Sequence, residues 1–164
     1  EETEAVLAHE LGHAQYGHLT FLLVMMLCLS ALLNPVLALV PEPWVSSPLV
    51  EIATLIGFIT LYIWLFYGTL MRQCEREADL ASAELMGSPT HLVSALEKLA
   101  LIAGNIRHVW CWHHGSIAER VSNVYRLHGD PVTSRRFHIR QRWVRIGFTV
   151  FTVLALGSQL FTRF

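Results

Sequence analysis

The first 71 residues contain no lysine or arginine, although the chain of 164 residues holds twelve of them. Charged residues make up only 15% of the chain, against about 25% in an ordinary soluble domain. Hydrophobic residues make up 53% and the formal net charge is -1. This composition excludes intrinsic disorder, is atypical of a soluble domain, and gives no reason to expect nucleic acid as a partner.

Cysteine is also scarce and has no recognisable spacing. The three cysteines are Cys28, Cys74 and Cys111, with no C-x-x-C pair among them. An odd number without a framework argues against a disulfide-stapled secreted domain, so we expect reduced thiols. The N-terminus is acidic and lacks methionine. We therefore expect no signal peptide there, and we expect the chain to be a piece of a longer protein.

Three apolar segments dominate what is present: Leu19–Val40, Leu49–Leu70 and Ile146–Thr162. The first has no charge over its length, and the second has only Glu51 near its start. A helix of 22 residues is about 33 Å long, enough for a hydrocarbon core of about 30 Å. The Pro-rich linker 41–48 predicts a turn, so the first two segments should form a transmembrane hairpin. The third is near the lower length limit for a span.

The distribution of positive charge predicts an orientation in the membrane. Eleven of the twelve lysines and arginines lie in residues 72–145, one is Arg163, and none lies in the turn at 41–48. Loops rich in these residues stay on the cytoplasmic side. Residues 1–18 and 72–145 are separated by two spans, so both should face the cytoplasm.

Residues 72–145 are more polar than the apolar segments, and their sequence pattern is typical of helices. We expect a helix over 72–88 ending at Gly87, a second helix with Ser88 as N-cap and Pro89 at its first position, and a stop at Gly104. Ser116 and Glu119 read as a capping box for a third helix. A basic run then leads into the last apolar segment.

One motif carries metal chemistry. His9-Glu10-Leu11-Gly12-His13 is an H-E-x-x-H sequence. On a helix, the two histidines project from one face and can share one Zn²⁺ at about 2.0–2.1 Å, while the glutamate reaches the water that the metal activates. Catalytic zinc needs a third protein ligand.

Two candidates exist for that third ligand. His18 follows His9 by nine residues, whereas a metzincin needs ten, and on a continuing helix it would face away. We interpret His18 as a polar residue at the membrane interface. Glu75 is the better candidate, because Asp79 lies four residues on and can accept a hydrogen bond from a ligand histidine, while Glu77 points away from their shared face. The other interpretation of Glu75 and Asp79 is a solvated charged helix face.

At this point the sequence resembles a family. The H-E-x-x-H motif, two spans and then Glu75-x-x-Ala78-Asp79 resemble the membrane-bound zinc endopeptidases related to the CAAX prenyl protease type 1 and the HtpX heat-shock protease. The segment from His114 to Val121 is similar to the family's H-P-x-x-x-x-R-[IV] element, with Gly115 where proline is usual. The resemblance covers residues 1–127. In family members, spans and a substrate-binding edge strand precede the H-E-x-x-H motif. The eight residues that precede His9 in this sequence do not contain these elements.

The resemblance implies one Zn²⁺ per chain and hydrolysis of peptide bonds. The expected ligands are His9, His13 and Glu75, and the expected general base is Glu10. His114 or Arg120 would stabilise the oxyanion, although Arg120 could equally serve only as an ion-pair partner. His113 and His114 are adjacent, so at most one points into the site, and the family pattern favours His114. The histidines that we expect at the surface or in packing are His91, His108 and His138.

The predicted fold is all-α, an integral membrane helical bundle with the hairpin inserted between the ligand-bearing helices and little or no β-structure. Its predicted parts are 1–18 (catalytic helix), 19–71 (hairpin), 72–142 (catalytic region with the third ligand) and 143–164 (third apolar helix). We expect a bacterial cytoplasmic membrane, an active site facing the cytoplasm, and a peptide or protein substrate that includes membrane proteins.

Three alternatives use the same residues differently. The first is a catalytically inactive membrane scaffold, which would have no use for Glu10. The second is a protease with zinc inside the bilayer, but Asn34-Pro35 is not followed by Asp-Gly. The third is a signalling-receptor protease module, which would need an external sensor domain.

Overall fold

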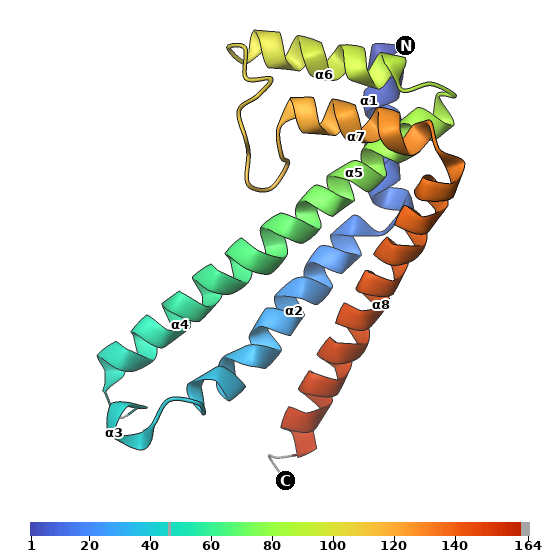
Figure 1. Cartoon of the computed structure of the whole chain (residues 1–164). Helices are drawn as coiled ribbons and strands as arrows, with labels where there is room; N and C mark the ends of the chain where they lie inside the picture. The colour runs from blue at the N-terminus through green and yellow to red at the C-terminus, as the bar shows by residue number, and fades with distance from the viewer. Residues whose placement is uncertain (46, 162–164) are drawn as a thin grey trace. The chain divides into compact units, whose positions relative to one another are not determined.

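The computed structural model describes residues 1–45 and 47–161, and every regular element within them is a helix (Figure 1). The predicted all-α fold is therefore confirmed. Thr162, the predicted end of the third apolar segment, and Arg163 lie outside the described residues.

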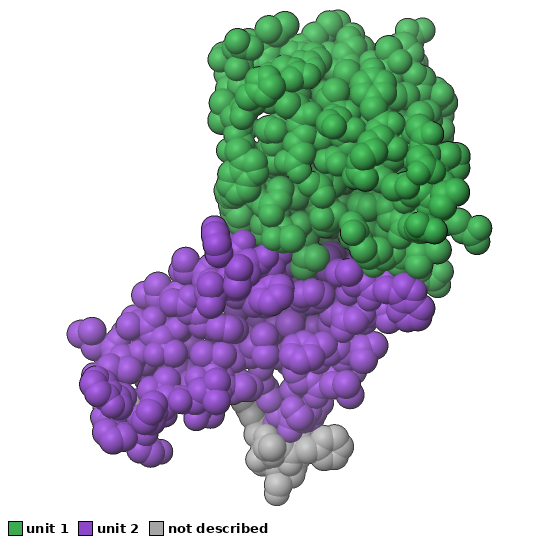
Figure 2. Space-filling model, viewed as in Figure 1, with its two compact units in different colours: residues 1–19, 68–142 green, residues 20–67, 143–164 purple. Residues whose placement is uncertain are grey.

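The chain forms two compact units, each assembled from two separate stretches of sequence (Figure 2). Unit 1 consists of residues 1–19 and 68–142, and unit 2 consists of residues 20–67 and 143–164. The chain thus leaves unit 1 and returns to it before it leaves a second time.

Unit 1 contains four helices and the first part of a fifth: α1 (Glu2–Gln15), α5 (Gly68–Leu85), α6 (Thr90–Ile102), α7 (Ile117–His128) and α8 (Pro131–Phe161). Ser116 caps α7 as predicted, because its Oγ accepts from the backbone N–H of Glu119 at 3.2 Å. Beyond the end of α6, Gly104 adopts a φ of 95°, a conformation that glycine tolerates best. Pro89 precedes the first residue of α6 instead of being that residue.

The hydrophobic core of unit 1 gathers small and aliphatic side chains from α1, α5, α6 and α7. Its buried members are Ala5, Ala83, Leu92, Leu96, Ala100, Ile117, Val121 and Val124. Leu80, Leu127 and Phe137 form a second buried cluster where α5, α7 and α8 meet. These contacts fix α5 against the other helices of the unit.

Helices α1 and α5 approach each other closely at Gly12. A Cβ atom on Gly12 would lie 2.9 Å from the Cβ of Ala81 and 3.0 Å from the Cα of Ala78, closer than packed side chains tolerate. Nearer the start of α1, the Oγ of Ser82 donates a 2.7 Å hydrogen bond to the backbone oxygen of Ala5. Small residues therefore bring the two backbones into direct contact.

Unit 2 contains the apolar helices: α2 (His18–Leu37), α3 (Glu42–Val45), α4 (Pro48–Tyr62), the π-helical turn η1 (Ile63–Tyr67) and the rest of α8. The buried hydroxyl of Tyr62 donates to the backbone oxygen of Met25 at 2.8 Å, which ties α4 to α2. The rings of Phe21 and Phe148 meet edge to face at 5.8 Å and tie α2 to α8.

Two helical runs in the described part of the chain are long and apolar enough to cross a membrane, His18–Leu37 and Pro48–Leu85. Large apolar side chains point outward along both, among them Leu23, Ile56 and Trp64. An apolar exterior of this kind suits lipid better than water. These helices fit a membrane protein. The third apolar segment is the end of α8, and its predicted crossing stays a prediction.

Candidate metal centre

Helix α1 places His9 and His13 one turn apart, with their Nε2 atoms 3.1 Å from each other. The carboxylate of Glu75, on α5, faces both rings: Oε2 lies 3.7 Å from His9 Nε2, and Oε1 lies 3.7 Å from His13 Nε2. One ligand atom from each residue falls within 4.8 Å of the other two. The structure thus brings together the three residues that the sequence predicts as ligands.

These separations fit a zinc ion. Donors that each lie about 2.1 Å from a tetrahedral Zn²⁺ are about 3.4 Å from one another. The observed separations of 3.1 and 3.7 Å lie on either side of that value. Two imidazoles and one carboxylate are also a donor set that catalytic zinc uses.

His13 is suited to bind a cation as a neutral ring. Burial lowers the pKa of His13 below its ordinary value, and the neighbouring His9 lowers it further. A neutral imidazole is the form that binds a metal. Glu10, which follows His9 on α1, is exposed, and its charge is close enough to act on His13 in the opposite direction.

Asp79 lies one turn beyond Glu75 and is almost fully buried. Its Oδ1 atom is 3.0 Å from Nδ1 of His9, the ring nitrogen that faces away from the metal position. Arg120, on α7, clamps the same carboxylate by donating from Nε at 2.9 Å and from Nη2 at 2.7 Å. Its Nη1 is 3.4 Å from Glu75 Oε2. Arg120 therefore serves as a partner of both carboxylates, the role that the sequence left open.

This pairing changes the electrostatics of Arg120. Burial acts to lower its pKa, but the charges of Asp79 and Glu75 outweigh burial and raise the pKa above its ordinary value. The charged guanidinium can then form charge-assisted contacts with both buried carboxylates.

Of the two adjacent histidines in the loop before α7, His114 reaches the site. Its Nδ1 lies 3.1 Å from Glu75 Oε1, and its ring is exposed. His113 instead contacts the thiol of Cys111 at 3.3 Å. Gly115 has a φ of 76°, so glycine at this position, where proline is usual, allows the sharp turn that follows His114.

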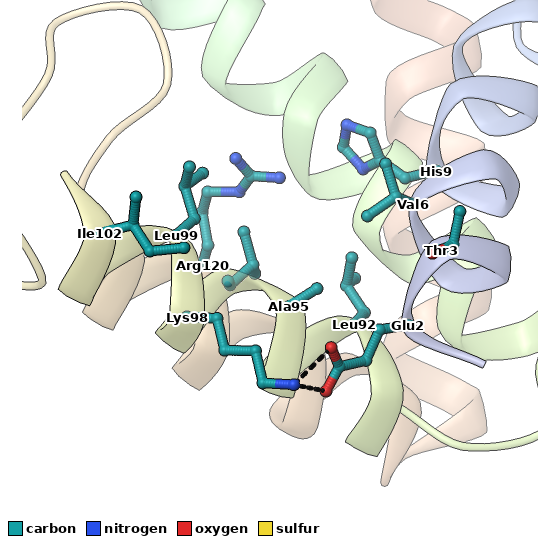
Figure 3. A pocket seen from close by; sticks show the side chains of 11 residues that line it. Glu2, Thr3, Val6, His9, Leu92, Ala95, Lys98, Leu99, Ile102 and Arg120 are labelled. Carbon is teal, nitrogen blue, oxygen red and sulfur yellow. Dashed lines mark hydrogen bonds and ion pairs between the residues drawn. The ribbon is translucent and has the colours of Figure 1, made fainter.

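A pocket of about 590 Å³ opens between α1 and α6, beside the metal position (Figure 3). Its lining is mostly apolar and includes Val6, Leu92, Leu96, Leu99 and Ile102. His9 and Arg120 also point into it. At another edge, Lys98 pairs with both oxygens of Glu2 at 2.7 Å. Two residues of the candidate site, His9 and Arg120, are therefore part of the pocket wall.

A second buried polar cluster was not expected from the sequence. His18 is 5% exposed, and its Nδ1 is 2.8 Å from Nδ1 of His13, a contact that the sequence did not predict. Glu77, only 1% exposed, places Oε2 at 3.1 Å from His18 and Oε1 at 3.1 Å from His138. His138 is thus no simple surface residue. Gly17, with a φ of 66°, ends the first helix and was the signal that could have revealed the position of His18.

The sequence model of peptidase family M48 matches residues 1–138, which include the helices of His9, His13 and Glu75 and the loop of His114. No curated protein and no solved structure matched the chain.

Proposed function

Since the chain belongs to peptidase family M48, a family of zinc metallopeptidases, we propose that it is a membrane-bound endopeptidase with His9, His13 and Glu75 as metal ligands and Glu10 as general base. The observation that carries this proposal is the convergence of three donors from α1 and α5 at zinc-like separations. The two candidate spans support the membrane assignment.

The chain's own residues divide the chemistry among them. His9, His13 and Glu75 would hold a Zn²⁺ ion, and that ion would supply a Lewis acid to polarise a carbonyl and to make water easier to deprotonate. Glu10 accepts the proton of the attacking water and passes it to the nitrogen of the leaving amine. His114, exposed beside Glu75, donates a hydrogen bond to the carbonyl oxygen as negative charge develops on it.

We propose that Arg120 does not contact the reacting atoms. Because Asp79 and Glu75 occupy its guanidinium, we assign it to holding these carboxylates instead of the oxyanion. Asp79 in turn fixes the ring of His9 through Nδ1.

The pocket between α1 and α6 is the place that we propose for a side chain of the substrate. His9 is part of the pocket lining, so the side chain of a substrate residue next to the scissile bond can reach the pocket. The aliphatic lining of the pocket favours a large apolar side chain. Peptide segments of membrane proteins are substrates of this kind. We further propose that the site faces the cytoplasm, on the strength of the positive charge in residues 72–145.

The decisive experiment compares zinc content with peptidase activity. The purified chain should bind one Zn²⁺, cleave an unfolded protein substrate, lose activity to a chelator, and regain it on addition of Zn²⁺. Glu10→Gln should keep the zinc but lose at least about 10²-fold in rate, because an amide cannot accept the proton. Glu4→Gln, an exposed glutamate on the same helix, is the matched control and should be fully active. A Glu10→Gln variant that cleaves at the normal rate would refute the mechanism.

A further inference from the structure

The two ligand histidines have different partners at the ring nitrogen that faces away from the metal position. Nδ1 of His9 meets the carboxylate of Asp79 at 3.0 Å. Nδ1 of His13 meets another imidazole instead, Nδ1 of His18 at 2.8 Å. A ligand histidine is oriented by the group that accepts from its second nitrogen, so the partner of His13 must itself be held in one state.

The break between α1 and α2 sets the position of the His18 ring. Helix α1 ends at Gln15, Gly17 adopts a left-handed conformation, and α2 begins at His18. The rings of His13 and His18 then meet edge to face, with centroids 4.9 Å apart and planes at 79°. Tyr16 stacks on His18 at 6.1 Å and on His138 at 5.1 Å.

Glu77 determines which nitrogen of His18 carries the proton. An ionised carboxylate only accepts hydrogen bonds, and Glu77 Oε2 lies 3.1 Å from His18 Nε2. The proton of a neutral His18 is therefore on Nε2, which leaves Nδ1 as an acceptor. His13 must donate to it from its own Nδ1, and the lone pair of His13 Nε2 then points to the metal position. His138 donates to the other oxygen of Glu77 at 3.1 Å and steadies the carboxylate.

We propose that His18 and Glu77 are positioning residues for His13: together they fix its ring orientation and its tautomer for metal binding. The inference rests on the proposed function, since it takes His13 to be a metal ligand. It assigns a task to a buried carboxylate and a buried imidazole that touch neither the metal position nor the pocket.

The test measures metal affinity directly. His18→Phe keeps an aromatic ring but removes the acceptor, and Glu77→Gln keeps the shape but removes one of two acceptor oxygens. With a chromophoric chelator as competitor, Zn²⁺ affinity should fall by about 10–100-fold in His18→Phe and by a smaller factor in Glu77→Gln. The visible spectrum of the Co²⁺-substituted chain should change in both variants, because the orientation of one ligand changes.

Two matched controls separate this role from general destabilisation. His91→Phe and Glu97→Gln alter a histidine and a glutamate whose contacts lie outside this cluster, and both variants should bind Zn²⁺ like the wild type. Melting temperatures recorded with chelator present show whether each variant is folded. Should His18→Phe fail to fold, Glu77→Gln decides the question.

The outcomes are distinct. A wild-type chain that binds no zinc would overturn the proposed function itself. A wild type that binds zinc, with folded His18→Phe and Glu77→Gln variants that bind it equally well, would overturn only the positioning role. A lower melting temperature with unchanged Zn²⁺ affinity and Co²⁺ spectrum would do the same, since that is what a purely structural contact predicts.

Discussion

At the scale of single residues, the site is unusual in burying three carboxylates on one helix, those of Glu75, Glu77 and Asp79. A buried carboxylate is costly unless charged or polar partners compensate it. Each of the three has such partners, and nearly all of them are histidines or Arg120 from other segments of unit 1. Removing one partner should therefore cost more than removing an exposed charge.

Sequence spacing along a helix was sufficient to predict which of these residues share a face. It was insufficient to predict the contacts that reach them from other helices. His9 and His13 share a face because they are four residues apart, and the same rule paired Glu75 with Asp79. The same spacing correctly predicted that Glu77 points away from that face. It could not predict that two histidines contact Glu77 there. His18 and His138 reach Glu77 through a helix break and through a distant helix, and neither contact leaves a periodic signal.

The pairing of His138 predicts a pH dependence of stability. The hydrogen bond to Glu77 raises the pKa of His138 above its ordinary value, against the effect of burial, and Glu84 on the same helix raises it further. The protonated ring thus stabilises the folded state below the unfolded pKa of about 6.5, and this contribution is lost as pH rises through the higher folded pKa.

Melting temperatures of the wild type and His138→Gln should consequently differ more at pH 6 than at pH 8.5. The rings of Tyr16 and Phe137 also face His138. The exposed His108, changed to glutamine, serves as control and should give the same small difference at both values. An equal difference for His138→Gln at both pH values would contradict the prediction.

At the scale of elements, the contact of α1 with α5 sets the distance between the ligands. We expect Gly12→Ala to lower the melting temperature, although alanine favours a helix by about 1 kcal/mol over glycine. The new methyl group would meet the backbone of Ala78 and the side chain of Ala81, and overpacking of this kind costs typically about 1–3 kcal/mol. Zn²⁺ affinity should fall with it.

Gly147→Ala is the matched control for this variant. Gly147 also lies within a helix, but a Cβ atom there would meet nothing within 4 Å. The Gly147→Ala substitution should leave the melting temperature unchanged or raise it slightly. Wild-type stability and zinc affinity in Gly12→Ala would show that α1 and α5 can move apart to accommodate the methyl group.

The pocket formed by α1 and α6 makes a prediction about specificity. Ala95→Trp should fill part of the volume, so kcat/KM should fall by at least about 10-fold for peptides with a large apolar residue next to the scissile bond. Peptides with alanine or glycine there should be affected much less. Ala103→Trp, at the exposed end of the same helix, should leave both rates unchanged. An equal loss for both peptide classes would remove the pocket from substrate recognition.

Two helix ends, the cap of α7 at Ser116 and the stop of α6 at Gly104, were predicted correctly because capping is local. Ser116 caps α7 as expected, but the side chain of Glu119 pairs with Arg76 of α5. The last apolar segment was predicted as a helix over 143–164, and its described part belongs to α8, which begins at Pro131 and ends at Phe161. Tertiary partners and the length of an uninterrupted helix depend on contacts that single-sequence patterns do not contain.

At the scale of the whole molecule, the alternation of polar and apolar stretches predicts a topology. Residues 41–48 contain no lysine or arginine, and residues 72–145 contain eleven. Each of these charges resists translocation, most strongly near the end of a span. We therefore expect the turn at 41–48 on the outside of the membrane and residues 72–145 on the cytoplasmic side.

Cysteine labelling in intact cells tests this topology. In a background without the three native cysteines, Glu42→Cys, which is exposed in α3, should react with a membrane-impermeant thiol reagent added outside. Ser122→Cys, exposed on α7, should react only after the cells are opened. The opposite pattern would place the site outside. Labelling of both positions in intact cells would mean that the hairpin does not cross the membrane.

The direct backbone contact at Gly12 has a consequence for how metal is acquired. The proposed ligands lie on two helices that already touch through Gly12, Ala78 and Ala81, so we expect a preorganised site at which a bound ion has little chain entropy to offset. In zinc fingers, by contrast, the ion drives folding itself. We therefore expect metal loading to be a separate event that can follow membrane insertion, and we expect ions to exchange without melting either helix.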